Sequence, residues 1–342
     1  MSHDLNDLGW SGFFLAQLDL AELELARLRI AEVHRTRLVA LGATGRVDLT
    51  SPHISSGDIA VGDWVLANDG AITRVLEAKT LIQRRAAGEE SISQVIAANV
   101  DTLFIVTSCN ADFNAKRLER YLAVAMEAGV EPVIILTKAD ISGETDSFVD
   151  QAKAIDRRVE VVALNAKGDD IAERLAMWCH KGATVALVGS SGVGKTTLTN
   201  ALTGSDDATA GIRDDSRGRH TTTHRALHEL RTGGWIIDTP GMRELRMSDA
   251  AEGIAELFDD ISALEGTCKF RDCEHEGEPG CAIRAALASG AIEQARFERW
   301  DKLRREDQVH TEAARARAAK DRKLSQTIKQ MKKERKRFTT KD

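Results

Sequence analysis

Cysteine is scarce in this chain, and long apolar runs are absent from it. Only 5 of the 342 residues are cysteine. That excludes a disulfide-stapled scaffold and predicts a reducing compartment. No apolar run approaches the roughly 20 residues that a membrane-spanning helix needs. Residues 1–10 lack the basic and apolar segments of a signal peptide. We therefore expect a cytoplasmic protein that does not enter a membrane.

A net positive charge is lacking too, because the formal net charge is -6. Taken alone, this value argues against binding to nucleic acid. The charge is unevenly distributed, however. From Asp301 to Asp342 there are 15 lysines and arginines against 7 carboxylates, so this basic tail carries about +8 and the rest about −14. A solvated helical tail and a contact with RNA phosphates both remain open.

Length and hydrophobic content indicate two or three domains with real cores, since 42% of the 342 residues are hydrophobic. Residues 1–35 are expected to form an N-terminal extension. Residues 36–95 contain short alternating runs separated by glycines, which predict a small β-barrel. Its arginines could line an RNA-binding face or merely keep the barrel soluble. These arginines are Arg35, Arg37, Arg46, Arg74, Arg84 and Arg85.

Residues 96–249 alternate short apolar runs with helical patterns, which is typical of a doubly wound α/β domain. The expected strands are 103–106, 132–136, 159–164, 185–188 and 235–237. A helix is expected at 116–128, where apolar residues recur at helical spacing. Cys109 and Cys179 lie in or beside apolar segments, and we interpret them as small buried hydrophobes.

One segment inside this region fits the phosphate-binding pattern G-x-x-x-x-G-K-[ST], between an apolar run and a helical segment. Its glycines would let several backbone N–H groups face a phosphate chain, and the helix N-terminus would add positive charge. Lys195 would reach the β- and γ-phosphates, and Thr196 would ligate Mg²⁺. The expected nucleotide contacts are Gly189, Ser190, Ser191, Gly192, Val193, Gly194, Lys195, Thr196 and Thr197.

A second phosphate-side motif, Asp238-Thr239-Pro240-Gly241, follows the run at 235–237. Asp238 would hold Mg²⁺ directly or through water, and the Gly241 N–H would face the γ-phosphate. Met242 stands where Ras-like enzymes have a water-orienting glutamine. His220 could take over that task, or it could be an ordinary loop residue. With no glutamine and no evident internal arginine finger, we expect slow hydrolysis by the free protein.

Two loops would contact the base. Thr137, Lys138 and Asp140 belong to a Thr-Lys-Ala-Asp segment that fits the guanine-reading N/T-K-x-D motif. The Asp140 carboxylate would accept hydrogen bonds from guanine N1–H and the N2 amine, which adenine lacks. Asn165, Ala166 and Lys167 form the second loop, with Asn165 where serine is usual. Together the two loops favour guanine, because an ATPase or kinase would have both only by coincidence.

Three cysteines and one histidine crowd into a short stretch: Cys268, Cys273, His275 and Cys281. Thiolates and an imidazole at such spacings suit a closed tetrahedral Zn²⁺ site. The intervening residues have little apolar content, so one structural ion per monomer would supply folding energy. Reduced, unligated cysteines are the alternative. Residues 250–342 are therefore expected to form a zinc-binding helical domain that ends in the basic tail.

The order of these motifs is base loops first, then the phosphate loop, then Asp238, which is that of a circularly permuted P-loop GTPase. The sequence resembles the ribosome small subunit-dependent GTPase A family (RsgA, also called YjeQ) over roughly residues 35–300. The matching motifs are the phosphate loop, Gly218-Arg219-His220-Thr221-Thr222-Thr223, residues 238–244 and the cysteine cluster. The resemblance implies that His220 is catalytic, that Thr222 ligates Mg²⁺, and that the barrel is an OB-fold.

The resemblance also implies a biological role. It suggests a monomeric GTP hydrolase that binds the rRNA of the small ribosomal subunit late in maturation, beside other assembly factors. Stimulation by the subunit and release after hydrolysis would complete the cycle. One alternative is a permuted GTPase for the large subunit, but such enzymes carry G-x-P-N-V-G-K-S, and Gly192 replaces that asparagine. Another is a GTP-gated RNA-binding module with negligible turnover, in which Met242 marks lost catalysis.

Overall fold

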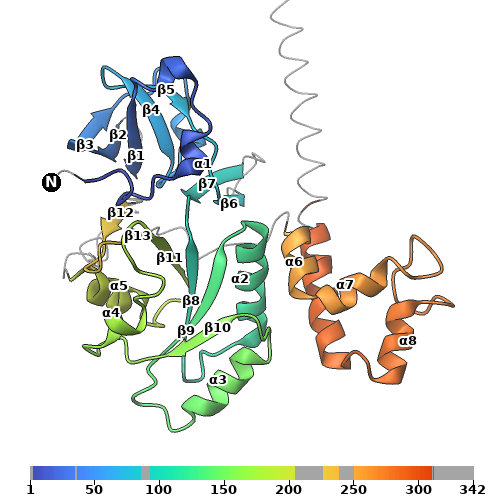
Figure 1. Ribbon diagram of the computed structural model, residues 1–342. Coiled ribbons are helices and arrows are strands. Elements are labelled where there is room, and N and C mark those ends of the chain that lie inside the picture. Colours follow the sequence, from blue (N-terminus) through green and yellow to red (C-terminus); the bar gives the residue numbers. More distant parts are fainter. Residues whose placement is uncertain are drawn as a thin grey trace, which may run out of the picture.

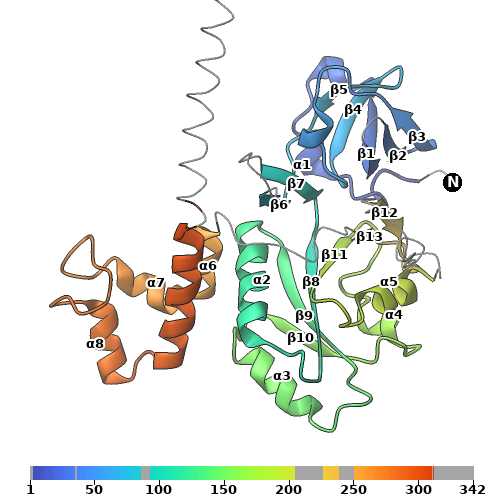
Figure 2. The same ribbon diagram turned by 180° about the vertical axis from the view of Figure 1, so that it is seen from behind.

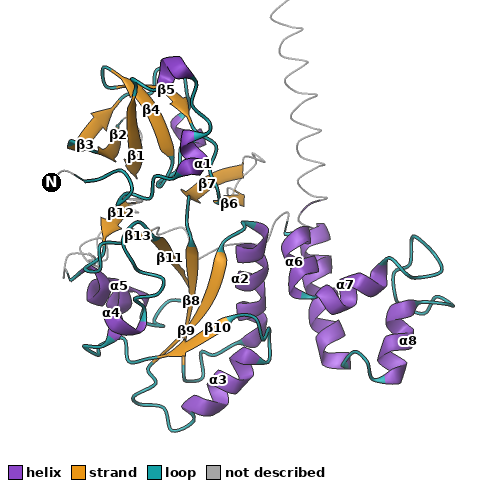
Figure 3. Cartoon of the chain, in the orientation of Figure 1, coloured by secondary structure: helices purple, strands orange, loops and turns teal. Residues whose placement is uncertain are grey.

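The computed structural model describes residues 3–34, 37–85, 93–204, 226–238, 250–309 and 311. Along the chain, a β-rich region is followed by an α/β region and then by a helical region (Figure 1). Figure 3 shows strands in the first two regions, whereas the described part of the last consists of helices and loops. Among the described helices, none is long and apolar enough to cross a bilayer.

The β-rich region begins with α1 (Gly12–Leu15) and η1 (Leu20–Glu22), and η2 (Ser56–Asp58) lies within it. Its five strands are β1 (Ala26–Val33), β2 (Leu38–Gly42), β3 (Gly45–Leu49), β4 (Trp64–Asn68) and β5 (Ala71–Val75). All four pairings, β1–β2, β1–β4, β2–β3 and β4–β5, are antiparallel. A parallel bridge between Thr50 and Ala71 joins the end of β3 to the start of β5 and closes the ring.

This barrel starts earlier than the sequence suggested. Strand β1 lies within residues 1–35, which were expected to be an extension outside the barrel. Residues of alternate strand positions, such as Leu28, Ile30 and Val65, fill the interior. A two-stranded sheet of β6 (Leu81–Arg85) and β7 (Ser93–Ala98) follows and leads into the α/β region.

The α/β region is a parallel sheet in the order β10-β9-β8-β11-β13. Its strands are β8 (Thr102–Ser108), β9 (Glu131–Thr137), β10 (Glu160–Ala163), β11 (Thr184–Val188) and β13 (Trp235–Asp238). They coincide with the five predicted strands to within two residues at each end. The sequence did not predict β12 (Ala226–Glu229), which pairs antiparallel with β13. Through one pair, Glu32 and Ala226, β12 also joins the sheet to β1 of the barrel.

Helices cover both faces of this sheet (Figures 1 and 2). On β8, Leu103 and Ile105 belong to the core under α2 (Ala115–Glu127), whereas Phe104 and Val106 belong to the core under the helices of the other face. Those helices are α4 (Ile171–Arg174) and α5 (Lys195–Thr203). A further helix, α3 (Thr145–Lys153), connects β9 with β10. In such a doubly wound sheet, ligands bind at the carboxyl ends of the strands.

The helical region consists of α6 (Ala251–Leu257), α7 (Asp259–Glu265), α8 (Ala282–Ser289) and a helix that begins at residue 294. It packs against α2, as both views show (Figures 1 and 2). Helix α6 approaches α2 closely at Gly253, where an added Cβ would lie 1.9 Å from the Ala123 carbonyl oxygen. The buried Glu119 of α2 pairs with Arg299 at 2.5 Å, and Arg120 pairs with Glu306 at 2.6 Å.

A buried arginine connects the barrel to the parallel sheet. The Arg29 guanidinium of β1 donates to the carbonyl oxygens of Leu8, Gly62 and Asn99, and to the Thr184 hydroxyl at the start of β11. Its side chain is only 1% exposed. Burial lowers the pKa of Arg29 to about 10, so the guanidinium is still charged at neutral pH. One residue therefore joins segments that are far apart in the sequence.

Candidate nucleotide and metal sites

The segment from Gly189 to Thr196 forms a tight loop between β11 and α5. Gly189, Gly192 and Gly194 have φ angles of 146, 80 and 98°, a region that side chains other than glycine rarely adopt. An added Cβ on Gly189 would lie 2.1 Å from the Val106 carbonyl oxygen. The structure thus shows why glycine is needed there, and it places the loop at the carboxyl end of the central strands, as predicted.

The lysine of this loop is folded back on the loop itself. Lys195 Nζ donates to the carbonyl oxygen of Gly189 at 2.6 Å and also contacts that of Ser190. Thr196 and Thr197 lie half-buried in the first turn of α5.

The base motif lies directly beside the phosphate loop. Thr137 is fully buried at the end of β9, and its hydroxyl is 2.5 Å from the Val193 carbonyl oxygen and 3.1 Å from that of Thr107. Its hydroxyl therefore ties β9 to the phosphate loop rather than facing a base. Lys138 has a left-handed backbone (φ 60°), after which Asp140 is exposed.

The second base loop adjoins the first. The Ala139 N–H donates to the Leu164 carbonyl oxygen at 3.3 Å. In the turn that follows, Asn165 Oδ1 accepts from the Lys167 N–H at 2.9 Å, so asparagine stabilises this turn with its side chain. Both base loops and the phosphate loop are thus brought together at one edge of the sheet.

Some predicted site residues lie outside the described part of the chain. These are His220, Thr222 and Gly241. The backbone of Asp238 is described: it ends β13, the parallel neighbour of β11, which carries the phosphate loop.

The side chains of Cys109 and Cys179 lie in the apolar cores rather than in these loops. Cys179 is fully buried, and burial raises the pKa of its thiol to about 12. Burial likewise raises the pKa of Cys109. Both are packed in apolar cores, in agreement with their prediction as small hydrophobes.

Sequence reasoning missed Arg117, in the first turn of α2. One terminal nitrogen of its guanidinium donates to the Ser190 hydroxyl of the phosphate loop. The other donates to the Asp112 carbonyl oxygen at 2.7 Å. The sequence shows only that α2 follows β8; once the sheet places β8 beside β11, the first turn of α2 must lie near the loop after β11.

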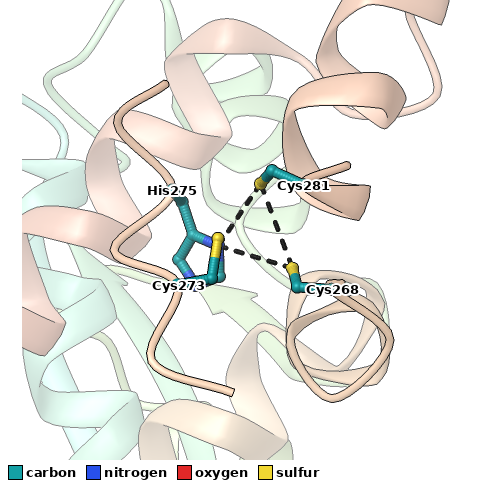
Figure 4. Close-up of side chains that lie close together, drawn as sticks. All are labelled: Cys268, Cys273, His275 and Cys281. Carbon is teal, nitrogen blue, oxygen red and sulfur yellow. Dashed lines mark hydrogen bonds between the residues drawn. The ribbon is translucent and has the colours of Figure 1, made fainter. Parts of the chain in front are cut away.

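Cys268, Cys273, His275 and Cys281 converge in the helical region, as predicted, with ligand atoms within 4.8 Å of one another (Figure 4). His275 Nδ1 is 3.7 Å from Cys268 Sγ and 3.5 Å from Cys281 Sγ, and these two sulfurs are 4.0 Å apart. A tetrahedral ion with zinc–ligand distances of about 2.0–2.3 Å separates its ligands by about 3.5–3.8 Å. The donor set and its spacing therefore fit a Zn²⁺ ion.

The surroundings hold this cluster in place. His275 is 1% exposed, its Nε2 lies 3.6 Å from a Glu265 carboxylate oxygen, and Arg284 donates to its carbonyl oxygen at 2.7 Å. Burial raises the pKa of the Cys268 thiol, while the N–H groups of Ala282 and Ile283, in the first turn of α8, lower it; the net shift is downward. A helix N-terminus that favours thiolate also favours metal binding.

The arginines proposed for an RNA face of the barrel are paired with carboxylates where the structure describes them. Arg37 contacts Asp48 at 3.1 Å, and Arg46 contacts Glu32 at 2.5 Å. Arg74 contacts Glu22 at 2.7 Å. Arg35 and the side chains of Arg84 and Arg85 lie outside the described part. The described barrel surface is therefore less positive than the count of arginines suggested.

Comparison with known proteins gives a consistent result. The family model "RsgA GTPase" matches residues 75–248. A second model, "ABC transporter", matches residues 172–332, which include the phosphate loop but leave out β8 and β9. A Mesorhizobium japonicum protein named small ribosomal subunit biogenesis GTPase RsgA is 52% identical over 91% of this chain and 92% of its own. A Vibrio parahaemolyticus protein with that name, numbered 2, is 46% identical over 89% of this chain and 86% of its own.

Solved structures agree with this fold. The crystal structure of YjeQ from Thermotoga maritima has a TM-score of 0.61 and 26% identity, covering 81% of this chain and 96% of that one. The structure of YloQ, described as a circularly permuted GTPase, has a TM-score of 0.58 and 22% identity, over 83% of this chain and 96% of its own. With both base loops ahead of the phosphate loop and with relatives matching nearly its whole length, the chain belongs to the RsgA GTPase family.

Proposed function

We propose that this protein hydrolyses GTP to GDP and phosphate as a late assembly factor of the small ribosomal subunit. The observation that carries the proposal is the 52% identity, over 91% of the chain, to a relative named for that role. In the cycle, the GTP-bound protein binds the rRNA of the subunit, the subunit stimulates hydrolysis, and hydrolysis releases the protein. We further propose that the protein works in the cytoplasm, as a monomer, beside other assembly factors.

The geometry of the base loops supports guanine as the base. Asp140 is exposed at the carboxyl edge of the sheet, beside the loop of Asn165 to Lys167. Its carboxylate would accept from guanine N1–H and N2, with Lys138 alongside. Thr137 would contribute indirectly, because its hydroxyl donates to the Val193 carbonyl oxygen and so holds the phosphate loop in place. Asp140→Asn should therefore shift preference from GTP to xanthosine triphosphate, and an unchanged GTP preference would contradict the assignment.

The phosphate side would supply the hydrolytic chemistry. Lys195 would exchange its carbonyl partners for β- and γ-phosphate oxygens, and the N–H groups of the glycine-rich loop would surround the phosphates. Thr196 and Asp238, with Thr222, would hold Mg²⁺, which neutralises charge that develops on the phosphates. His220 would orient the attacking water, because Met242 cannot. Gly241 would contribute its backbone N–H to the γ-phosphate.

The remaining regions would contact RNA. The closed order β3-β2-β1-β4-β5 supports an OB-fold, a class of barrel that binds oligonucleotides on one face. Because its described arginines are paired, RNA phosphates would have to compete with Asp48, Glu32 and Glu22 for them. One structural Zn²⁺ per monomer would hold the cysteine loops in the helical region. The basic tail would add contacts with rRNA phosphates.

Binding to purified subunits tests this function. The protein should co-sediment with small subunits in the presence of a non-hydrolysable GTP analogue and should do so more weakly with GDP. Large subunits serve as the control and should retain little protein. Equal retention by both subunits, or retention that ignores the nucleotide, would contradict the proposal. Retention by large subunits alone would favour the alternative role in large-subunit assembly.

A further inference from the structure

Two cations converge on the same short piece of the phosphate loop. Lys195 reaches the carbonyl oxygens of Gly189 and Ser190 from within the loop. Arg117 reaches the Ser190 hydroxyl from outside it, from the first turn of α2. The lysine belongs to the motif that the sequence already identified. The arginine belongs to a different segment, and the assigned functions leave it unused.

The Arg117 side chain is held in place by a second contact. Its other terminal nitrogen donates to the Asp112 carbonyl oxygen at 2.7 Å, in the loop that connects β8 with α2. The Asp112 carboxylate is more distant, at 3.5 Å, and 39% exposed. The guanidinium is closest to a hydroxyl and a carbonyl oxygen, and its ion pair with the more distant, partly exposed Asp112 carboxylate compensates its charge only in part. Solvent screens it only partly, because the side chain is 31% exposed.

This arrangement differs from the other arginine pairs of α2. Arg120, one turn further along, is paired with the carboxylate of Glu306 in the helical region and serves to hold that region against α2. Lys116 is exposed on the same turn and lines a groove between α2 and the helical region, together with Arg299 and Leu303. Of these three neighbouring cations, Arg117 alone contacts the loop that is expected to receive a highly negative triphosphate.

We propose that Arg117 is a positioning residue for GTP hydrolysis, which acts through Ser190 to fix the phosphate loop and adds positive charge beside the bound phosphates. The inference rests on the proposed function in taking GTP as the substrate. Electrostatic stabilisation of transferring phosphates by arginine is a general device. Here the arginine belongs to the chain itself and follows β8.

The test compares guanine nucleotides that differ only in the number of phosphates. Affinities of GMP, GDP and a non-hydrolysable GTP analogue are measured by competition with a fluorescent guanine nucleotide, for the full-length protein and for Arg117→Gln. The loss of affinity in the variant should grow with each phosphate, to roughly tenfold for the GTP analogue, and kcat should fall as well. Lys116→Gln, which removes one charge from the same helical turn, should change none of these values.

Two further variants separate positioning from folding. Arg117→Lys keeps the charge without the forked geometry and should recover part of the loss. In a Ser190→Ala background, Arg117→Gln should lower the affinity for the GTP analogue less than it does alone, because the hydroxyl that accepts from Arg117 is already absent. An equal loss for all three nucleotides accompanied by a lower Tm would show a merely structural residue and overturn the proposal. Unchanged nucleotide affinities in Arg117→Gln would also overturn the proposal. If the parent protein still binds and hydrolyses GTP, that result would leave the proposed function intact.

Discussion

Replacing Arg29 with methionine should destabilise the whole protein, although the residue lies far from the nucleotide loops. Methionine fills much of the space of the arginine stem but donates no hydrogen bond. The carbonyl oxygens of Leu8, Gly62 and Asn99 and the Thr184 hydroxyl would lose their common partner. The carbonyl oxygens of Leu8 and Asn99 would then lack a hydrogen-bond donor at the point where the barrel meets β11, whereas that of Gly62 would keep the Asn99 side-chain amide at 3.0 Å.

The magnitude follows from the number and burial of these acceptors. Leaving one buried acceptor unpaired costs about 1–3 kcal/mol, so leaving the Leu8 and Asn99 carbonyl oxygens unpaired costs about 2–6 kcal/mol. The buried arginine is itself destabilised, because burial lowers its pKa to about 10. That cost is recovered when the charge is removed, so we expect a net loss of about 3 kcal/mol in the free energy of unfolding.

Urea unfolding monitored by circular dichroism would measure this loss. Arg37→Met is the matched control: Arg37 lies in the same barrel, but its pair with Asp48 is 55% and 69% exposed. A surface pair of that kind contributes at most about 1 kcal/mol. Arg29→Lys should fall between the two, since an ammonium cannot reach all four acceptors. If Arg29→Met proves as stable as Arg37→Met, the buried arginine does not hold the barrel on the sheet.

Three other perturbations test separate parts of the structure. Burial raises the pKa of Asp63 to about 6 from 3.8, so the folded state favours the protonated acid. The free energy of unfolding should therefore fall by about 3 kcal/mol as the pH rises from about 4 to above 6. Asp63→Asn should flatten this decline in Tm, and an equally steep decline would contradict the assignment. Gly253→Ala should separate α6 from α2 and lower Tm by several degrees, because the added Cβ would lie 1.9 Å from the Ala123 carbonyl oxygen. Gly266→Ala is the control and should leave Tm unchanged, because no atom lies within 4 Å of the added Cβ. Chelation should release one zinc per chain, measured with a colorimetric indicator, and should unfold residues 266–290 first in hydrogen exchange; a protein that contains no zinc after purification in zinc-supplemented buffer would contradict the site.

Sequence patterns predicted the parallel sheet well because its strands are buried on both faces. Such strands are continuous apolar runs, and the glycine-rich loop between two of them has a fixed spacing. The cysteine cluster was predictable for a similar reason, since tetrahedral metal ligands come from a short, glycine- and proline-rich stretch. The sequence therefore predicted the parallel strands, the phosphate loop and the cysteine cluster, because each depends on residues that are close together in the chain.

The features that sequence reasoning missed depend on contacts between distant segments. Strand β1 carries charged side chains, including the buried Arg29, so its alternation did not suggest a barrel strand. Strand β12 has four residues and is stabilised by pairing with β13 and β1 rather than by its own apolar content. The contact of Arg117 with Ser190 joins residues 73 positions apart. The pairing of the barrel arginines with carboxylates likewise appears only once the strands are assembled.

Steady-state GTP hydrolysis with and without purified small ribosomal subunits tests the central claim most directly. The free protein should turn over slowly, small subunits should stimulate it strongly, and large subunits should not. His220→Ala should bind GTP normally but lose the stimulation. Equal stimulation by both subunits, or none by either despite tight GTP binding, would contradict the assignment of this GTPase to the small subunit.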